Sequence, residues 1–148
     1  MSVRANVQFA ASVDKVREIY RELGERPIVR SCSLRTECCQ FRLTGKVPFL
    51  TVGEAIVAAK ALRASGRKAL PVRDDGACPL LDPRTSRCLI YDGRPFGCRS
   101  HFCAAAGGPL ARRDVADLIH RLEQIDATLG GSGGVSLPVA VAKALRET

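Results

Sequence analysis

The stretch ACPLLDPRTSRCLIYDGRPFGCRSHFC, at residues 77–103, contains four of the seven cysteines of this 148-residue chain. It lies within a segment, residues 67–110, that holds five of the eight prolines and shows no helical spacing of apolar residues. Such a segment forms little regular structure alone, and a metal bound by its thiols would hold it in place. The other three cysteines lie in SCSLRTECCQF, at residues 31–41. Thiols gathered in two short stretches indicate a shared ligand, a metal ion or an iron–sulfur cluster.

Disulfide bonds or simple burial could also account for cysteines in a chain of this size. The first twenty residues include Arg4, Asp14, Lys15 and Arg17, which leave no apolar run for a signal peptide or a membrane span. We therefore expect a cytoplasmic protein without membrane contact, in which thiols stay reduced and disulfides are rare. Burial as a small apolar side chain is common for an isolated cysteine, but it explains seven cysteines in two groups poorly.

Outside the two cysteine-rich stretches, apolar residues recur at helical spacing. They predict four helices, near residues 8–23, 51–66, 112–129 and 137–146. Thr51 and Glu54 have the spacing of a capping box at the start of the second helix. The expected fold is mainly α, a small single domain of three to four helices around an irregular cysteine-rich metal- or cluster-binding core. This domain would span residues 1–130, and residues 131–148 would form a flexible Gly/Ser linker and a short C-terminal helix.

The spacing of the cysteines bears on the kind of ligand. Zinc ribbons use paired Cys-x2-Cys knuckles, whereas nine residues separate Cys78 from Cys88 and Cys88 from Cys98. Wide spacings suit an iron–sulfur cubane, whose corners are reached from separate loops. The spacing therefore favours a cluster over zinc. Seven cysteines and His101 also make eight donors, enough for two tetrahedral zinc sites.

Several pieces of this region resemble a known bacterial family. They are the pair Cys38-Cys39, then DGACPLL at 75–81, CLIYDGRP at 88–95 and CRSHFC at 98–103. In this order they resemble the zinc- or iron-chelating CxxCxxCC domain, a cysteine-cluster family related to a segment of flagellin lysine methylases. Its members are often described as iron–sulfur oxidoreductase-like. The chain departs from the family at Arg35, where the motif would place a cysteine.

The resemblance implies a set of metal ligands. The expected first ligands are Cys39, Cys78, Cys88 and Cys98. Cys38 competes with Cys39, because adjacent side chains diverge and both can rarely reach one metal. Cys103 and Cys32 are reserve ligands, and Cys32 loses its nearest motif partner to Arg35. His101 is a further candidate, with a hydrogen-bonded or exposed loop histidine as its ordinary explanation.

Arg94 also matches the family and has two interpretations. It could contact the sulfur of a cluster and tune its potential, or form an ion pair with Asp82 or Asp92 that holds the loop. The net charge is +8, and eighteen of the 23 basic residues are arginine. Those beside cysteines could neutralise thiolates (Arg35, Arg87, Arg94, Arg99), and others could attract an acidic partner.

Two functions of different class remain from the sequence. The first is a cysteine-bound iron–sulfur cluster, expected as 4Fe-4S, with a redox or electron-transfer role. The second is a structural zinc module whose basic surface binds an acidic protein partner. Nucleic acid is a less favoured partner, because the arginines are spread out and no aromatic residues interleave them. No serine–histidine–aspartate set or paired carboxylates indicate catalysis, so any activity would be oxidoreductase-like.

Overall fold

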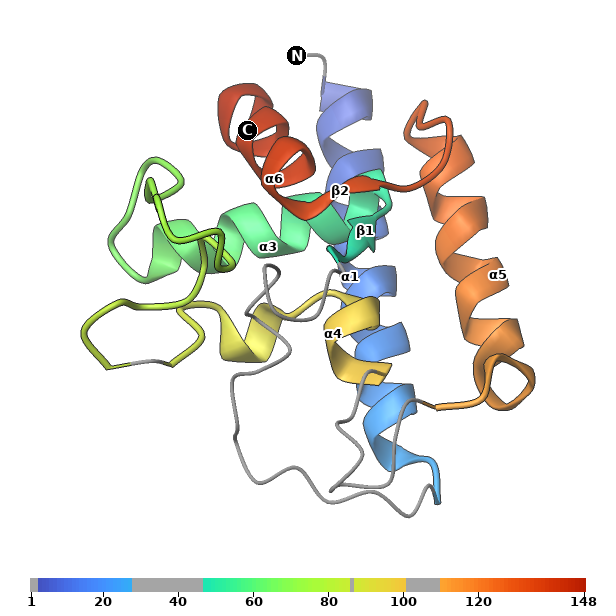
Figure 1. The fold of residues 1–148 in the computed structure, drawn as a ribbon. Coiled ribbons are helices and arrows are strands. Elements are labelled where there is room, and N and C mark those ends of the chain that lie inside the picture. Colours follow the sequence, from blue (N-terminus) through green and yellow to red (C-terminus); the bar gives the residue numbers. More distant parts are fainter. Residues whose placement is uncertain (1–2, 28–46, 86, 101–109) are drawn as a thin grey trace.

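The structure is a computed structural model that describes residues 3–27, 47–85, 87–100 and 110–148. Helices dominate the described residues, together with a 3-10 turn and a two-stranded sheet (Figure 1). The elements are α1 (Val3–Glu25), β1 (Phe49–Leu50), α3 (Val52–Ala64), η2 (Tyr91–Gly93), α4 (Phe96–Ser100), α5 (Arg112–Thr128), β2 (Val135–Ser136) and α6 (Leu137–Glu147). The prediction of a small, mainly helical single domain is confirmed.

Helix α3 is the central element of the fold. Its alanine-rich sequence buries residues on nearly every side, including Ala55, Ile56, Ala58, Ala59 and Leu62. Helices α1 and α5 lie side by side and pack on one side of α3, while α6 packs on the other (Figure 1). A helix that is apolar all round lies inside the protein, because each of its faces needs a neighbour to cover it.

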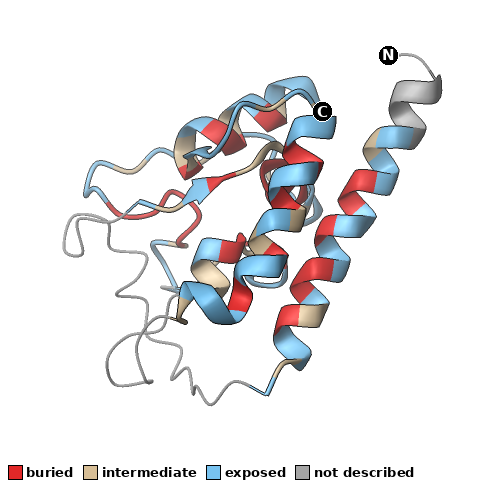
Figure 2. Cartoon of the chain, turned by 90° about the vertical axis from the view of Figure 1, so that its right-hand side faces the viewer, coloured by how far each residue is buried: buried red, intermediate tan, exposed pale blue. Residues whose placement is uncertain are grey.

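Two apolar clusters share α3. The first, which we call the helix cluster, joins α1, α3 and α5 through residues such as Val16, Ile19, Val57, Leu118 and Leu122. The second, the loop cluster, joins α3 and α6 to residues 77–90. Its members include Ala58, Leu62, Ala77, Cys78, Leu80, Leu81, Ile90 and Val141. Figure 2 shows the buried residues along the sides of the helices that face their neighbours.

The segment 67–110 contains more regular structure than its prolines predict. Both η2 and α4 lie within it, although each is short. Leu80, Leu81 and Ile90 are buried in the loop cluster, so apolar contacts hold part of this segment against α3 and α6. The sequence showed no periodicity here because these three residues belong to a loop and not to a helix or a long strand.

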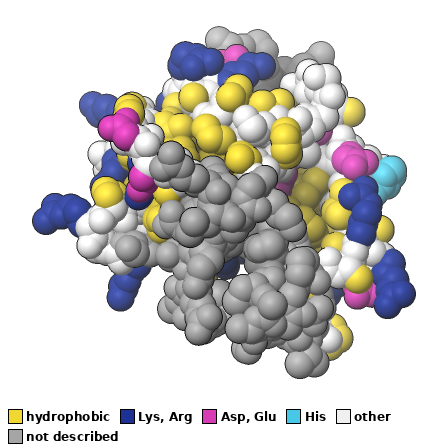
Figure 3. Space-filling model, viewed as in Figure 1, with side chains coloured by type: hydrophobic (Ala, Val, Ile, Leu, Met, Phe, Trp, Pro, Cys, Tyr) yellow, Lys and Arg dark blue, Asp and Glu magenta, His cyan; other side chains and the backbone are white. Residues whose placement is uncertain are grey.

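The small sheet ties the C-terminal helix to the middle of the chain. Strands β1 and β2 are antiparallel, with Phe49 opposite Ser136 and Leu50 opposite Val135. The backbone N–H of Leu137 also donates to the Pro48 carbonyl at 2.9 Å. Leu50 is buried, whereas Phe49 is 65% exposed. Figure 3 shows apolar side chains gathered over this region, while Lys and Arg side chains stand at separate places around the edge of the view.

Asp126, near the end of α5, organises the glycine-rich turn that follows it. Its carboxylate accepts hydrogen bonds from the N–H groups of Val52 (2.8 Å) and Gly133 (3.0 Å), and its carbonyl accepts one from Gly131 (2.8 Å). One buried carboxylate thus connects the start of α3 to residues 130–133. Within the described ranges, no helix is long and apolar enough to cross a membrane.

Gly131→Ala is expected to destabilise the protein. A Cβ at this position would overlap the Asp126 carboxylate, so either the backbone or this carboxylate, with its hydrogen bonds to Val52 and Gly133, must shift. Such overpacking costs roughly 1–3 kcal/mol of unfolding free energy, which urea denaturation would measure. Gly24→Ala is the control without overlap, because its added methyl group meets no atom of a neighbouring element within 4 Å, and alanine favours helix α1 there. A Gly131→Ala variant as stable as wild type would contradict the expectation.

Candidate metal centre

Cys78 and Cys88 lie on the two arms of one loop. Leu81 and Cys88 form an isolated antiparallel bridge, and the backbone N–H of Leu89 donates to the Leu80 carbonyl at 2.8 Å. The Leu81 N–H donates to the Cys78 carbonyl at 3.0 Å, which makes the turn that begins the loop. We call residues 78–89 the cysteine loop. Its two arms carry two cysteines that are ten positions apart in the sequence, and Cys88 pairs with Leu81, three positions after Cys78.

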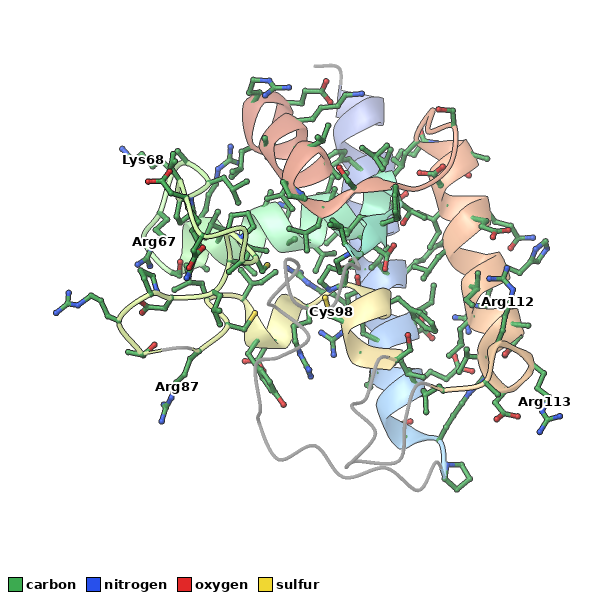
Figure 4. The ribbon with its side chains drawn as sticks, viewed as in Figure 1. Arg67, Lys68, Arg87, Cys98, Arg112 and Arg113 are labelled. Atoms are coloured by element: carbon green, nitrogen blue, oxygen red, sulfur yellow. The ribbon has the colours of Figure 1, made fainter. Side chains whose placement is uncertain are left out.

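Cys98 lies on the short helix α4, in the middle of the view in Figure 4. The turn η2 connects α4 to the cysteine loop and packs closely on α3, since a Cβ on Gly93 would come within 2.7 Å of the Ala61 methyl. The backbone N–H of Cys98 donates to the Pro95 carbonyl at 3.0 Å. Helix α4 therefore has a defined position relative to the cysteine loop.

The three described cysteines contact the same apolar cluster. Cys78 is only 5% exposed and belongs to the loop cluster itself, while the half-buried Cys88 and Cys98 pack against it. They reach it from separate pieces of backbone, two arms of a loop and a short helix. Contact with this cluster partly shields all three side chains from water.

These three cysteines do not complete a metal site. Within residues 3–27, 47–85, 87–100 and 110–148, no group of three histidine, cysteine, aspartate or glutamate side chains could hold a metal ion. The other predicted ligands, Cys32, Cys38, Cys39 and Cys103, lie outside the described residues, as does His101. A centre made from the predicted set therefore also needs donors from residues 28–46 or 101–109.

The ends of both segments are fixed by described residues. The Leu110 N–H donates to the Ser100 carbonyl at 2.9 Å, which closes the stretch that contains Cys103. Arg26 donates two hydrogen bonds to the Asp117 carboxylate on α5, at 2.9 and 2.5 Å, just before residues 28–46. At the other end of that stretch, Pro48 lies against Gly97, the residue before Cys98. The described part of the chain thus resumes, at residues 47 and 48, beside α4.

Two arginines bring positive charge close to described thiols. Arg99 is half-buried, and its guanidinium lies over the Tyr20 ring, 4.2 Å from the centroid. Burial lowers the pKa of Arg99, and the charges of Tyr20, then Asp92, then Cys98 oppose that change. Arg73 donates to the Leu81 carbonyl at 2.5 Å, and Asp75 first, then Cys78, raise its pKa. Both cations would offset part of the negative charge of thiolates that bind a metal.

Arg94 holds its own loop through a neighbouring tyrosine. Its Nε donates to the Tyr91 carbonyl at 2.8 Å, and its guanidinium stacks on the Tyr91 ring, 3.8 Å from the centroid. Among the ion pairs of the described residues, none joins Arg94 to Asp82 or Asp92. The interpretation that Arg94 holds its loop is therefore supported by its hydrogen bond to the Tyr91 carbonyl. It is not supported by an ion pair with Asp82 or Asp92.

Sequence reasoning missed two residues near the thiols. Arg73 is five positions from Cys78 and gave no signal, because only the fold places its charge near that cysteine. Glu54 was predicted only as part of the capping box, which is confirmed: its Oε2 accepts hydrogen bonds from the Thr51 N–H (2.9 Å) and hydroxyl (3.0 Å). Its other oxygen faces α4, a contact that the sequence pattern could not reveal.

A helical domain that carries two thiols on one loop and a third on a short helix, near arginines, is a scaffold suited to a thiolate metal site. Residues 30–124, which include all seven cysteines, match a family described as CxxCxxCC, putative zinc- or iron-chelating domain. The chain belongs to this family, as its cysteine pattern predicted. No curated protein and no solved structure matches the chain.

Proposed function

We propose that the chain binds an iron–sulfur cluster of the 4Fe-4S type through cysteine thiolates and takes part in electron transfer or redox sensing. The observation that carries this proposal is the contact of Cys78, Cys88 and Cys98 with one apolar cluster, from three separate pieces of backbone. A cubane presents its corners to ligands from separate loops, whereas a zinc knuckle takes two thiolates from one tight turn. The family, described as zinc- or iron-chelating, supports metal binding in general.

In this proposal each part of the chain has a physical task. Cys78, Cys88 and Cys98 provide three thiolates, and Cys39 provides the fourth, with Cys38 as its competitor and Cys103 and Cys32 in reserve. The loop cluster shields the site from water, which strengthens electrostatic interactions there. Arg73 and Arg99 offset part of the thiolate charge, and Arg94 shapes the loop before α4. When bound, the cluster supplies one-electron chemistry, with a potential set by charge, hydrogen bonds and solvent exposure.

A structural zinc site is the second candidate. Among its described residues, the cysteine loop has one antiparallel bridge and few backbone hydrogen bonds, so a metal would contribute much of its order. The exposed cationic side chains of Lys68 and Arg87 point away from the body of the protein and would face an acidic partner (Figure 4). Zinc would then fix the shape of a binding module and take no part in electron transfer.

Metal analysis after anaerobic purification distinguishes the two candidates. The cluster predicts a brown protein with broad absorption near 400 nm, about four iron and four sulfide per chain, and little zinc. One or two zinc ions per chain in a colourless protein would support the structural alternative. A folded chain that retains neither metal, and takes up neither on reconstitution, would refute both.

A further inference from the structure

Glu54 and Asp126 are the two buried carboxylates of the described residues, and Glu54 is 3% exposed. The Glu54 carboxylate accepts four hydrogen bonds. Two come from the Thr51 N–H and hydroxyl and reach Oε2. The other two reach Oε1, from the Phe96 backbone N–H at 2.7 Å and from the Tyr20 hydroxyl at 3.4 Å. Burial raises the pKa of Glu54, and these hydrogen bonds oppose the rise by favouring the ionised form.

The bond to Phe96 matters because Phe96 is the first residue of α4. The first N–H groups of a helix have no partner within the helix, and a carboxylate there also interacts favourably with the helix dipole. Helix α4 has only five residues, too few to be stable through its own hydrogen bonds. Its position therefore depends on contacts with the rest of the protein. One of these contacts is the buried hydrogen bond from the Phe96 N–H to the charged Glu54 carboxylate.

Tyr20 connects the same carboxylate to the residue after Cys98. The Tyr20 hydroxyl donates to Glu54, and its ring lies under the Arg99 guanidinium. Arg99 in turn donates to the carbonyls of Arg94 at 2.6 Å and Asp92 at 2.5 Å. Contacts that begin at Glu54 thus reach α4 on both sides of Cys98. One reaches Phe96, two positions before it, and the other reaches Arg99, one position after it.

We propose that Glu54 is a positioning residue for Cys98, holding α4 so that the thiol stands where a metal bound by the other cysteines needs its ligand. The inference rests on the proposed function, since it gives Glu54 a role in metal retention beyond capping α3. Residues that orient metal ligands typically contribute about 10–100-fold to metal affinity. The sequence offers no hint of this role, because Glu54 is more than forty positions from Cys98.

The test compares Glu54→Gln with Asp126→Asn. Each change turns a buried carboxylate into an amide of the same shape and weakens the hydrogen bonds at the start of α3. The two residues differ in that Glu54 accepts a hydrogen bond from α4, whereas Asp126 has none to that helix. Release of the bound metal to excess EDTA is followed at a temperature where both variants are folded, together with their urea midpoints. Glu54→Gln is expected to release metal about tenfold faster than wild type, and Asp126→Asn within about twofold, although both midpoints fall.

A second measurement uses the metal-free chain. Site-resolved iodoacetamide labelling should show faster alkylation of Cys98 in Glu54→Gln, unchanged alkylation of Cys78, and no change at either cysteine in Asp126→Asn. Equal metal release by the two variants, or Cys98 alkylation at the wild-type rate in Glu54→Gln, would overturn the positioning role. Wild-type protein that holds no metal would refute the proposed function instead, and the alkylation rates would still report whether Glu54 positions Cys98.

Discussion

Replacing Cys78 with serine is expected to reduce the metal content of the purified protein to background. Cys78 is the described cysteine that is buried within the loop cluster, and a serine hydroxyl is a poor metal donor at neutral pH. Without the Cys78 thiolate, one iron of the proposed cluster would have no protein ligand. Iron, sulfide and zinc per chain, measured after identical anaerobic purification of variant and wild type, provide the test.

Burial requires a control for this experiment, because serine also places a hydroxyl in an apolar environment. An unpaired buried hydroxyl costs roughly 1–3 kcal/mol, which could unfold the loop without any role for the thiolate. Ala77→Ser introduces the same hydroxyl one position earlier, where the residue is also 5% exposed, and leaves every thiol in place. Metal loss in Ala77→Ser equal to that in Cys78→Ser would show that packing, and not ligation, explains the result.

The metal content of Cys32→Ser distinguishes the four expected ligands from the other cysteines of the motif. The predicted neighbour of Cys32 is replaced by Arg35, so this arm of the family motif is already incomplete in the chain. We expect Cys32→Ser to retain most of its metal, whereas Cys88→Ser and Cys98→Ser lose it. Full metal content in Cys88→Ser, or complete loss in Cys32→Ser, would contradict the four-ligand set and favour the arrangement with two zinc sites.

The four long helices could be predicted because each has local signals that its neighbours do not override. The stripe of Val115, Leu118 and Leu122 predicts α5, and these residues are buried in the helix cluster. The capping box of Thr51 and Glu54 predicts the start of α3 within a residue. Helix α1 begins five positions before the predicted range, at Val3, because a helix that has formed can extend beyond the first apolar residue of its stripe.

The site was less predictable because it is built from contacts between distant residues. The family motif indicated the cysteines, but nothing local to Glu54 indicates that its second oxygen accepts a bond from Phe96. Arg73 was missed for the same reason, and Arg94, for which a cluster sulfur or a carboxylate partner was expected, donates to a backbone carbonyl. Periodicity and spacing describe neighbours along the chain, whereas these interactions depend on how α1, α3 and α4 meet.

Removing the metal is expected to loosen the cysteine loop and α4 and to leave α5 protected. The backbone N–H groups of Leu81, Asp82 and Leu89 are bonded within the loop, where a single bridge joins the two arms. Their hydrogen exchange should accelerate by about tenfold or more in the metal-free protein, equivalent to at least roughly 1.4 kcal/mol of local opening free energy. Amide exchange measured by NMR or mass spectrometry on both forms provides the comparison.

Helix α5 serves as the internal control, since it packs on α1 and α3 through the helix cluster and contains no cysteine. Its amides at Leu118 and Leu122 should change by no more than about twofold, because opening this helix requires separation of apolar faces that the metal does not touch. Faster exchange in both regions would mean that the metal stabilises the whole domain. Unchanged exchange in the cysteine loop would mean that Leu80, Leu81 and Ile90 hold it in place without any metal, since their burial in the loop cluster would then be sufficient.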